Sequence, residues 1–262
     1  MSKLTIRDLL NRKGKRQFSY VRVDSVAQAS AAQMAGIDMI GTAFEESTRG
    51  FPGSAPDTHF RFGLKYGQYA NGTEILRAAF SAMENGADSV YTAQSMEMVS
   101  ILAREGIPVF GHIGLVPPKM GWTGGYCAVG KTSKEAVKLF HEVKDYESAG
   151  AVGIEIEVVP YLVATEISRR TPLLTMSLGS GSGCDMQYLF ASDILGETVG
   201  RIPRHARIYR NFNEEYARLE RERINAFREF VDDIDSGAFP LPKHLVEISA
   251  SEFDSFINEI DE

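Results

Sequence analysis

The chain has 262 residues, of which 44% are hydrophobic and 24% charged, and its formal net charge is −7. Nucleic acids and anionic membranes are also negatively charged, so this acidic balance makes both poor partners. No apolar run approaches the roughly 18 residues that a membrane span needs. The two cysteines, Cys127 and Cys184, lack the spacing of a metal site or a disulfide framework. We therefore expect reduced thiols and a cytoplasmic protein.

One pattern recurs along the chain: a helical segment ends in Gly and an apolar, β-branched run follows at once. Gly takes the left-handed helix cap without a Cβ penalty, so the repeat predicts βα units and a parallel sheet. Strands are expected near 17–23, 37–43, 60–66, 88–93, 107–113, 151–158 and 172–178. Helices are expected near 26–35, 73–85, 95–105, 131–149, 161–170 and 184–195. This spacing favours a (β/α)8 TIM barrel over an open doubly wound sheet, with 198–203 as the best candidate for a weak eighth strand.

Beyond the barrel, residues 213–237 form a long charged segment whose apolar positions have helical spacing. This pattern predicts a helix packed on the barrel or on another subunit. The acidic tail, 251–262, is expected to be a short helix or disordered. We therefore expect residues 1–262 to form a single barrel domain with a C-terminal helical extension from about 213 to 262.

The catalytic face of such a barrel lies where strands end and βα loops begin. The loop 44–59 is long and rich in small and polar residues, which fits either a mobile cover over a substrate or a surface loop without function. The fourth strand ends at Tyr91, and the fifth places His112 near its tip between Gly111 and Gly114. A lone histidine is more often structural, but the flanking glycines suggest close backbone approach and favour a site.

The sixth strand carries Glu155 and Glu157 on one face of GIEIEVVP. Carboxylates in a buried parallel strand cost free energy unless they are paired, protonated or near solvent. They could be a general base, a metal ligand or part of a buried ion pair. The seventh strand, with Ser177, runs into the Gly-rich SLGSGSGCD. We expect this turn to open a helix, and its backbone N–H groups could hold phosphate or carboxylate.

Several ordered motifs resemble the ketopantoate hydroxymethyltransferase (3-methyl-2-oxobutanoate hydroxymethyltransferase) family of the phosphoenolpyruvate mutase/isocitrate lyase superfamily. They are TIRDLL, GHIGLVPP, GGYCAVGKT, YESAGA, IEVVP, SLGSGSGCD, SDILG, IPRHARIYRNF and SGAFPLPKH. The resemblance implies a (β/α)8 barrel that forms a homo-oligomer. It also implies transfer of a one-carbon unit from 5,10-methylenetetrahydrofolate to a branched 2-keto acid, toward pantothenate, with magnesium holding the keto acid.

By position, the resemblance makes Glu157 the glutamate of the E-x-V-P motif and His112 the histidine of the GHLGL-type motif. Glu157 would then be the base that removes a proton beside the ketone to give an enolate. His112 would hydrogen-bond the substrate or the transferred group.

The chain departs from the family where the metal is held. Thr42 and Ala43, or alternatively Phe44 and Glu45, replace the Asp-Ser pair of the second strand. The third strand lacks its terminal Asp and has Lys65 nearby. Tyr91 and Ala93 replace the Lys and Glu of the fourth strand. Since magnesium prefers carboxylate oxygens, Glu155 or Glu45 is left as a candidate replacement ligand. The expected substrate-binding residues are Thr42, Ala43, Glu45, Lys65, Tyr91 and Ser177.

Three interpretations therefore remain open. The chain could be a hydroxymethyltransferase with a rearranged site. It could be a metal-independent lyase, decarboxylase or aldolase on another 2-keto acid, with Lys65 substituting for the metal's charge. It could also be a non-catalytic relative that binds a small molecule.

Overall fold

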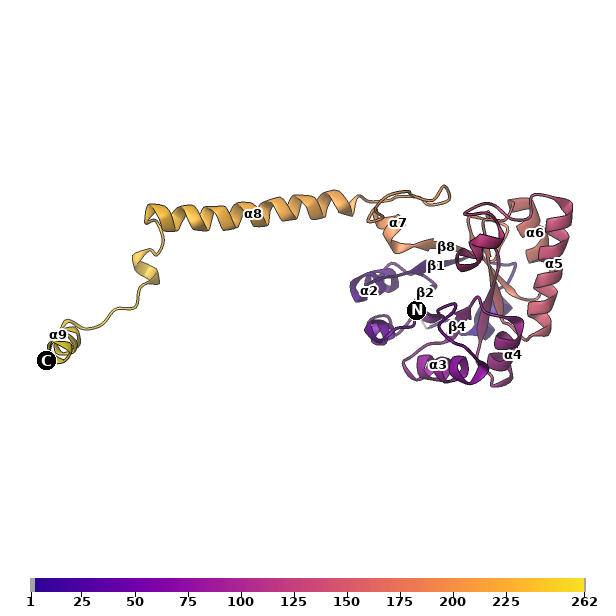
Figure 1. Cartoon of the computed structure of the whole chain (residues 1–262), viewed down its shortest axis with the longest axis horizontal. Coiled ribbons are helices and arrows are strands. Elements are labelled where there is room, and N and C mark those ends of the chain that lie inside the picture. Colours follow the sequence, from indigo (N-terminus) through magenta and orange to yellow (C-terminus); the bar gives the residue numbers. More distant parts are fainter. Residues whose placement is uncertain (1–2, 262) are drawn as a thin grey trace. The chain divides into compact units, whose positions relative to one another are not determined.

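The computed structural model describes residues 3–261, which separate into two compact units, 1–210 and 211–262. In the first unit, parallel strands form a closed barrel in sequence order, and β1 pairs with β8 to complete it (Figure 1). The strands are β1 (Phe18–Arg22), β2 (Met39–Ala43), β3 (His59–Leu64), β4 (Ser89–Thr92), β5 (Val109–Gly114), β6 (Gly153–Glu157), β7 (Leu174–Leu178) and β8 (Met186–Phe190). The predicted (β/α)8 barrel is confirmed.

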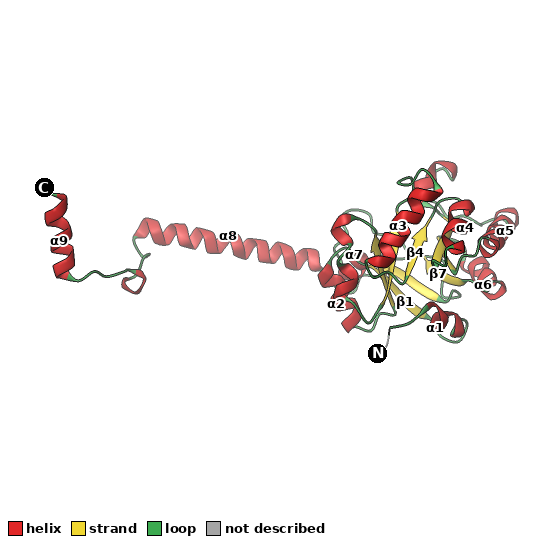
Figure 2. Cartoon of the chain, turned by 90° about the horizontal axis from the view of Figure 1, so that it is seen from below, coloured by secondary structure: helices red, strands yellow, loops and turns green. Residues whose placement is uncertain are grey.

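Helices surround this barrel, as Figure 2 shows. They are α1 (Ile6–Asn11), α2 (Val26–Met34), α3 (Gly72–Glu84), α4 (Met96–Arg104), α5 (Ser133–Ser148), α6 (Tyr161–Arg170) and α7 (Ala191–Leu195). Four of the helix-to-strand connections pass through a glycine at positive φ, namely Gly36, Gly86, Gly106 and Gly150. The helix–Gly–strand pattern of the sequence therefore marks real left-handed caps.

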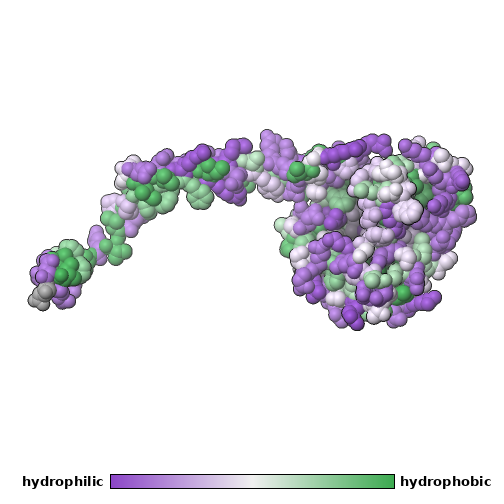
Figure 3. All heavy atoms as spheres, viewed as in Figure 1, coloured by the Kyte–Doolittle hydropathy of each residue, from purple (hydrophilic) through white to green (hydrophobic). Residues whose placement is uncertain are grey.

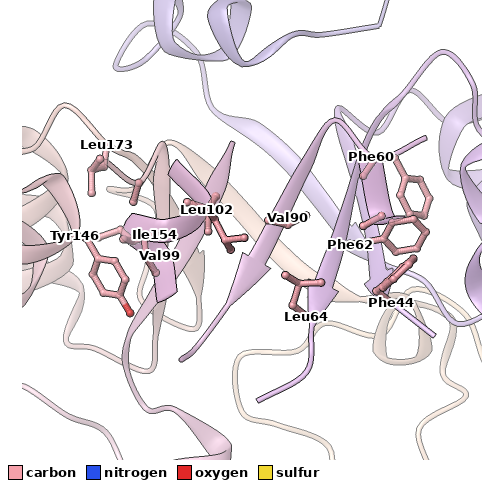
Figure 4. Packing of buried hydrophobic residues seen from close by; sticks show 14 of the residues in the cluster. Phe44, Phe60, Phe62, Leu64, Val90, Val99, Leu102, Tyr146, Ile154 and Leu173 are labelled. Carbon is pink, nitrogen blue, oxygen red and sulfur yellow. The ribbon is translucent and has the colours of Figure 1, made fainter. Parts of the chain in front are cut away.

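Two apolar layers stabilise the barrel. The outer layer lies between strands and helices, where Phe44, Phe60 and Phe62 pack in a row on β2 and β3 (Figure 4). The inner layer fills the barrel at the amino ends of its strands, and the fully buried Leu9 of α1 joins it. The barrel is therefore solid at one end, and the opposite end is left for a site.

The eighth strand is not at 198–203 as predicted but at Met186–Phe190, inside the segment expected to be helical. Only its last part, Ala191–Leu195, is a helix. The Asp185 carboxylate accepts hydrogen bonds from the Thr175 backbone N–H and hydroxyl, both at 2.8 Å. This contact sets the segment beside β7, and the alternating Met186 and Tyr188 face the barrel interior.

The loop 44–59 contains two 3-10 turns, Glu46–Thr48 and Phe51–Ser54. Phe51 and Pro52 are buried, and the second turn packs on α2. Buried apolar contacts anchor the loop, so the structure gives no support to the expectation of a mobile cover.

The second unit contains α8 (Phe212–Ser236), a 3-10 turn (Pro242–His244) and α9 (Ala250–Ile260). The helix predicted at 213–237 is thus present, and the tail is helical. Asn211 caps the start of α8 and Gly237, at positive φ, ends it. Large apolar side chains of this unit are exposed, including Phe227, and Figure 3 shows apolar groups along α8. That residues 1–262 form one domain with a C-terminal extension stays a prediction.

Candidate active site

A cavity of about 240 Å³ lies at the carboxyl ends of the strands, where the sequence placed the site. Its lining comes from β1 to β8 and from the loop after β5. The lining residues are Tyr20, Arg22, Thr42, Ala43, Arg61, Gly63, Leu64, Lys65, Tyr66, Tyr91, Ala93, His112, Pro117, Pro118, Glu155, Glu157, Leu178, Tyr188 and Phe190. The polar and charged groups are not spread evenly around this wall.

The β5–β6 side of the cavity concentrates charge around His112. The register of these strands sets His112 opposite Glu155, and Gly114 opposite Glu157. His112 Nδ1 lies 3.5 Å from a Glu155 carboxylate oxygen, and Nε2 lies 3.3 Å from one of Glu157. Gly114 is required here because a Cβ would lie 2.3 Å from the Glu157 carbonyl oxygen, and its φ is +88°. The strands can therefore approach closely enough to hold the imidazole between two carboxylates.

His112 is built to carry a positive charge. Burial alone would lower its pKa, but the hydrogen bond with Glu157 and the charges of both carboxylates raise the pKa on balance. Nε2 donates to the Leu115 carbonyl at 2.8 Å, and Nδ1 lies 2.6 Å from the Tyr91 hydroxyl. Burial and the Glu155 charge hold the pKa of Tyr91 well above its usual value, so its phenol stays neutral. Protein groups thus engage both ring nitrogens.

Glu155 forms an ion pair with Arg61 across the barrel, and both side chains are almost fully buried. The guanidinium also lies over the ring of Tyr20, with its carbon 4.4 Å from the ring centroid. The buried-ion-pair interpretation of Glu155 therefore describes the structure, and a metal-ligand role does not. Arg61 was missed in the sequence, although an arginine between Phe60 and Phe62 carries the same signal that marked Glu155.

Glu157 ends β6 beside a strained backbone position. Val158 has φ of +51°, a conformation that β-branched residues rarely adopt. Three contacts hold the turn: the Val158 N–H donates to Leu178, the Val158 carbonyl accepts from Val129, and the Val159 N–H donates to the Ser180 hydroxyl. Strain of this kind is kept where surrounding structure imposes it, and it is common at active sites.

The β2–β4 side presents no carboxylate. Ala43, Gly63 and Ala93 line the wall there, together with Thr42, Arg61, Lys65 and Tyr91. Phe44 packs outward, 5.0 Å between its ring centroid and that of Phe62. The Asp-Ser pair is replaced either by Thr42 and Ala43 or by Phe44 and Glu45. In neither case does a carboxylate line the cavity, because Glu45 is not part of the lining.

This donor set does not fit magnesium. The wall formed by β2–β4 supplies no carboxylate, and Arg61 already engages the Glu155 carboxylate. Within residues 3–261, no group of three or more His, Cys, Asp and Glu side chains is arranged to hold a metal ion.

The other predicted binding residues divide into two groups. Thr42 and Lys65 line the cavity with Tyr91, but Lys65 is 61% exposed and ion-paired with Glu45 at 2.6 Å. Glu45 is not part of the lining. Ser177 is buried away from the cavity, and its hydroxyl accepts a hydrogen bond from the Ser180 backbone N–H. The structure therefore does not bring Glu45 and Ser177 to the cavity.

The Gly-rich turn after β7 does not open a helix as predicted, because it leads directly into β8. It offers no helix N-terminus to an anion. Ser180 instead ties the turn to β6, since its hydroxyl donates to the Ile156 carbonyl at 2.8 Å. The turn supports the backbone that carries Glu157.

Residues 24–242 match the family model described as ketopantoate hydroxymethyltransferase. A 3-methyl-2-oxobutanoate hydroxymethyltransferase of Kosmotoga olearia is 30% identical, covering 93% of this chain and 98% of the relative. The enzyme of that name from Staphylothermus marinus is 32% identical over 93% and 96% of the two chains. The one from Thermus thermophilus is 30% identical over 92% and 98%.

Among solved structures, a phosphonopyruvate hydrolase in complex with oxalate and Mg²⁺ superimposes with a TM-score of 0.53 at 12% identity, covering 98% of this chain and 96% of that one. A 2,3-dimethylmalate lyase, a member of the PEP mutase/isocitrate lyase superfamily, has a TM-score of 0.51 at 12% identity over 93% and 92% of the chains. At this identity the likeness shows the shared barrel fold alone.

Proposed function

The chain belongs to the ketopantoate hydroxymethyltransferase family, and from that premise we propose that it transfers a one-carbon unit to a branched 2-oxo acid. The observation that carries the proposal is the position of Glu157. This carboxylate lines the barrel cavity 3.3 Å from the His112 imidazole, whose pKa is raised, on the motif that resembles the family's base.

In the proposed reaction, Glu157 removes the proton from C3 of the 2-oxo acid. The C3–H bond breaks, an O–H bond forms on Glu157, and the electron pair moves to the 2-oxo oxygen to give an enolate. C3 then forms a bond to the methylene carbon of 5,10-methylenetetrahydrofolate. That carbon loses both C–N bonds and takes its hydroxyl oxygen from water, so the atoms balance.

We assign His112 a positioning role. Since both of its ring nitrogens already have protein partners, the imidazole holds the Glu157 carboxylate in place rather than contacting the substrate. Tyr91 and Glu155 complete the support, because they contact the opposite ring nitrogen. The expected contact between His112 and substrate stays a prediction.

The proposal is tested by incubating the full chain with 3-methyl-2-oxobutanoate and 5,10-methylenetetrahydrofolate. Formation of the hydroxymethylated 2-oxo acid, with release of tetrahydrofolate, is expected. Deuterium exchange at C3 in D₂O should occur without the folate, because it needs only the base. Turnover of other 2-oxo acids by carbon–carbon cleavage, with no transfer to this one, would favour the lyase interpretation instead.

We also propose a cytoplasmic homo-oligomer in which a second copy covers the second unit. Many large apolar side chains of residues 211–262 are exposed, far more than isolated surface residues require. Size-exclusion chromatography with light scattering tests this: a monomer at micromolar concentration would contradict it. No helix within the described residues is long and apolar enough to cross a membrane.

A further inference from the structure

The charge in the cavity is opposite in sign to that of the whole chain. Four of its lining residues carry positive charge when His112 is protonated, and these are Arg22, Arg61, Lys65 and His112. Two carboxylates, Glu155 and Glu157, oppose them. The ion pair with Glu45, which lies outside the lining, neutralises Lys65. The lining cation with the longest ion pair is then Arg22, whose partner Asp24 also lies outside the lining.

Arg22 is therefore the most weakly paired of these cations. It ends β1 at the mouth of the cavity, and its side chain is 36% exposed. Its ion pair with Asp24 is long, at 3.9 Å, and its guanidinium carbon lies 5.1 Å from the centroid of the Phe190 ring. The guanidinium of an arginine packed on an aromatic ring presents its N–H groups to a planar, bidentate acceptor such as a carboxylate.

Arg61 supplies a second cation at the floor. One of its nitrogens donates to Glu155, while Nε and Nη1 have no hydrogen-bond partner in the part of the chain that the structure describes. Aromatic side chains surround them, since the guanidinium carbon lies 5.2 Å from the ring centroids of both Tyr91 and Phe110. Buried N–H groups without an acceptor cost free energy. An anionic ligand in the cavity that Arg61 lines would lower that cost through its charge.

We infer that the cavity binds the negatively charged end of a 2-oxo acid through Arg22 and Arg61, in place of the divalent cation that the wall on the β2–β4 side cannot hold. This inference rests on the proposed function, because it identifies how that function's substrate is held. It also moves the substituting charge from Lys65, which is exposed and paired, to two arginines that line the site. Arg61 stabilises the enolate because a fixed charge acts strongly where water is excluded.

The test uses the full chain stripped of metal with EDTA. Binding of 3-methyl-2-oxobutanoate is measured by calorimetry, and deuterium exchange at its C3 is followed by NMR, with and without added Mg²⁺. Binding and exchange should both persist in EDTA and change less than twofold on adding Mg²⁺. The matched ligand 3-methyl-2-butanone, which lacks the carboxylate, should bind at least tenfold more weakly.

Two variants locate the charge. Arg22→Met should weaken binding of the 2-oxo acid at least tenfold without altering the thermal unfolding curve. The double variant Arg61→Met/Glu155→Gln removes both charges of the buried ion pair together, so it leaves no unpaired buried charge and the chain should fold. Deuterium exchange at C3 should fall at least tenfold. Arg104→Met, on the exposed end of α4, is the control and should leave both measurements unchanged.

The outcomes separate the two proposals. Binding or exchange that appears only with Mg²⁺, or variants that bind like the unmodified chain, would overturn the arginine assignment. Binding in EDTA that Arg22→Met weakens, with neither exchange nor transfer, would overturn the proposed function and leave the arginine site standing. The absence of binding under every condition would overturn both.

Discussion

The two sides of the cavity wall show how one barrel can keep part of a site and rebuild the rest. On the β5–β6 side, His112 lies between Glu155 and Glu157 at short distances. On the β2–β4 side, Ala43, Gly63 and Ala93 line the wall beside the cation Arg61, and that side supplies no carboxylate. The strands are in parallel register on both sides, so the difference is one of side chains and not of fold. A shared scaffold therefore does not fix the charges of the side chains that line its cavity.

The charged side also illustrates a physical constraint on such changes. A lone Glu155 inside the barrel would bear the full cost of an unpaired buried charge. Arg61, on a strand of the opposite side, offsets this cost through the ion pair. The two residues therefore depend on each other, and neither is expected without the other.

The largest expected effect comes from removing the base on the charged side. Glu157→Gln should reduce C3 deuterium exchange by about 10²–10⁴-fold, the usual contribution of a positioned general base. Binding of the 2-oxo acid should change little. Glu84→Gln, exposed on α3, is the matched control. Exchange within threefold of the unmodified chain would show that another group is the base.

Breaking the link between the two sides should cost stability. Arg61→Met leaves Glu155 buried without its partner, and it should lower the free energy of unfolding by about 3–5 kcal/mol. Adding Glu155→Gln should restore most of that loss. Urea denaturation of both variants measures the effect. Equal stability of the single variant and the unmodified chain would mean that the pair is not buried in solution.

The β2–β4 side, which lacks carboxylates, can be given them. Gly63→Asp/Ala93→Glu should create a magnesium site with a midpoint of unfolding that rises with Mg²⁺ concentration, whereas the unmodified chain should show no rise. Space allows the first change, because a Cβ at Gly63 would meet its nearest neighbour, Tyr91, at an ordinary 3.5 Å. A Mg²⁺-dependent rise of equal size in the unmodified chain would contradict the difference between the two sides.

The smallest effect concerns pH. The pKa of His112 is raised in the folded chain, so its contribution to stability is complete below the unfolded histidine value of about 6.5. It is lost as pH rises through the folded pKa, with a slope of at most about 1.4 kcal/mol per pH unit. NMR titration of the imidazole should show protonation persisting above pH 6.5. In Glu157→Gln the pKa should fall, and an unchanged value would contradict the assigned cause.

The spacing of apolar residues and the glycines at helix ends predict most of this fold from the sequence. They can do so because each helix–Gly–strand unit is encoded by neighbouring residues. The position of the eighth strand could not be predicted because the mostly apolar MQYLFASDIL suits a helix as well as a strand. What makes its first half a strand is a contact between segments, Asp185 with Thr175. The charged side was predictable because Glu155 and Glu157 break an apolar strand. Arg61 breaks its strand in the same way, yet its pairing with Glu155 depends on how the barrel closes.

Leu9 gives the barrel a further property. Its side chain is completely buried among apolar residues at the amino ends of the strands, so the interior is blocked on that side. A small reactant must enter and leave by the mouth, beside Pro117 and Pro118. If a bulkier second reactant occupies that mouth, the first cannot escape. The kinetics should then be compulsory-order, with the 2-oxo acid binding first and its product released last.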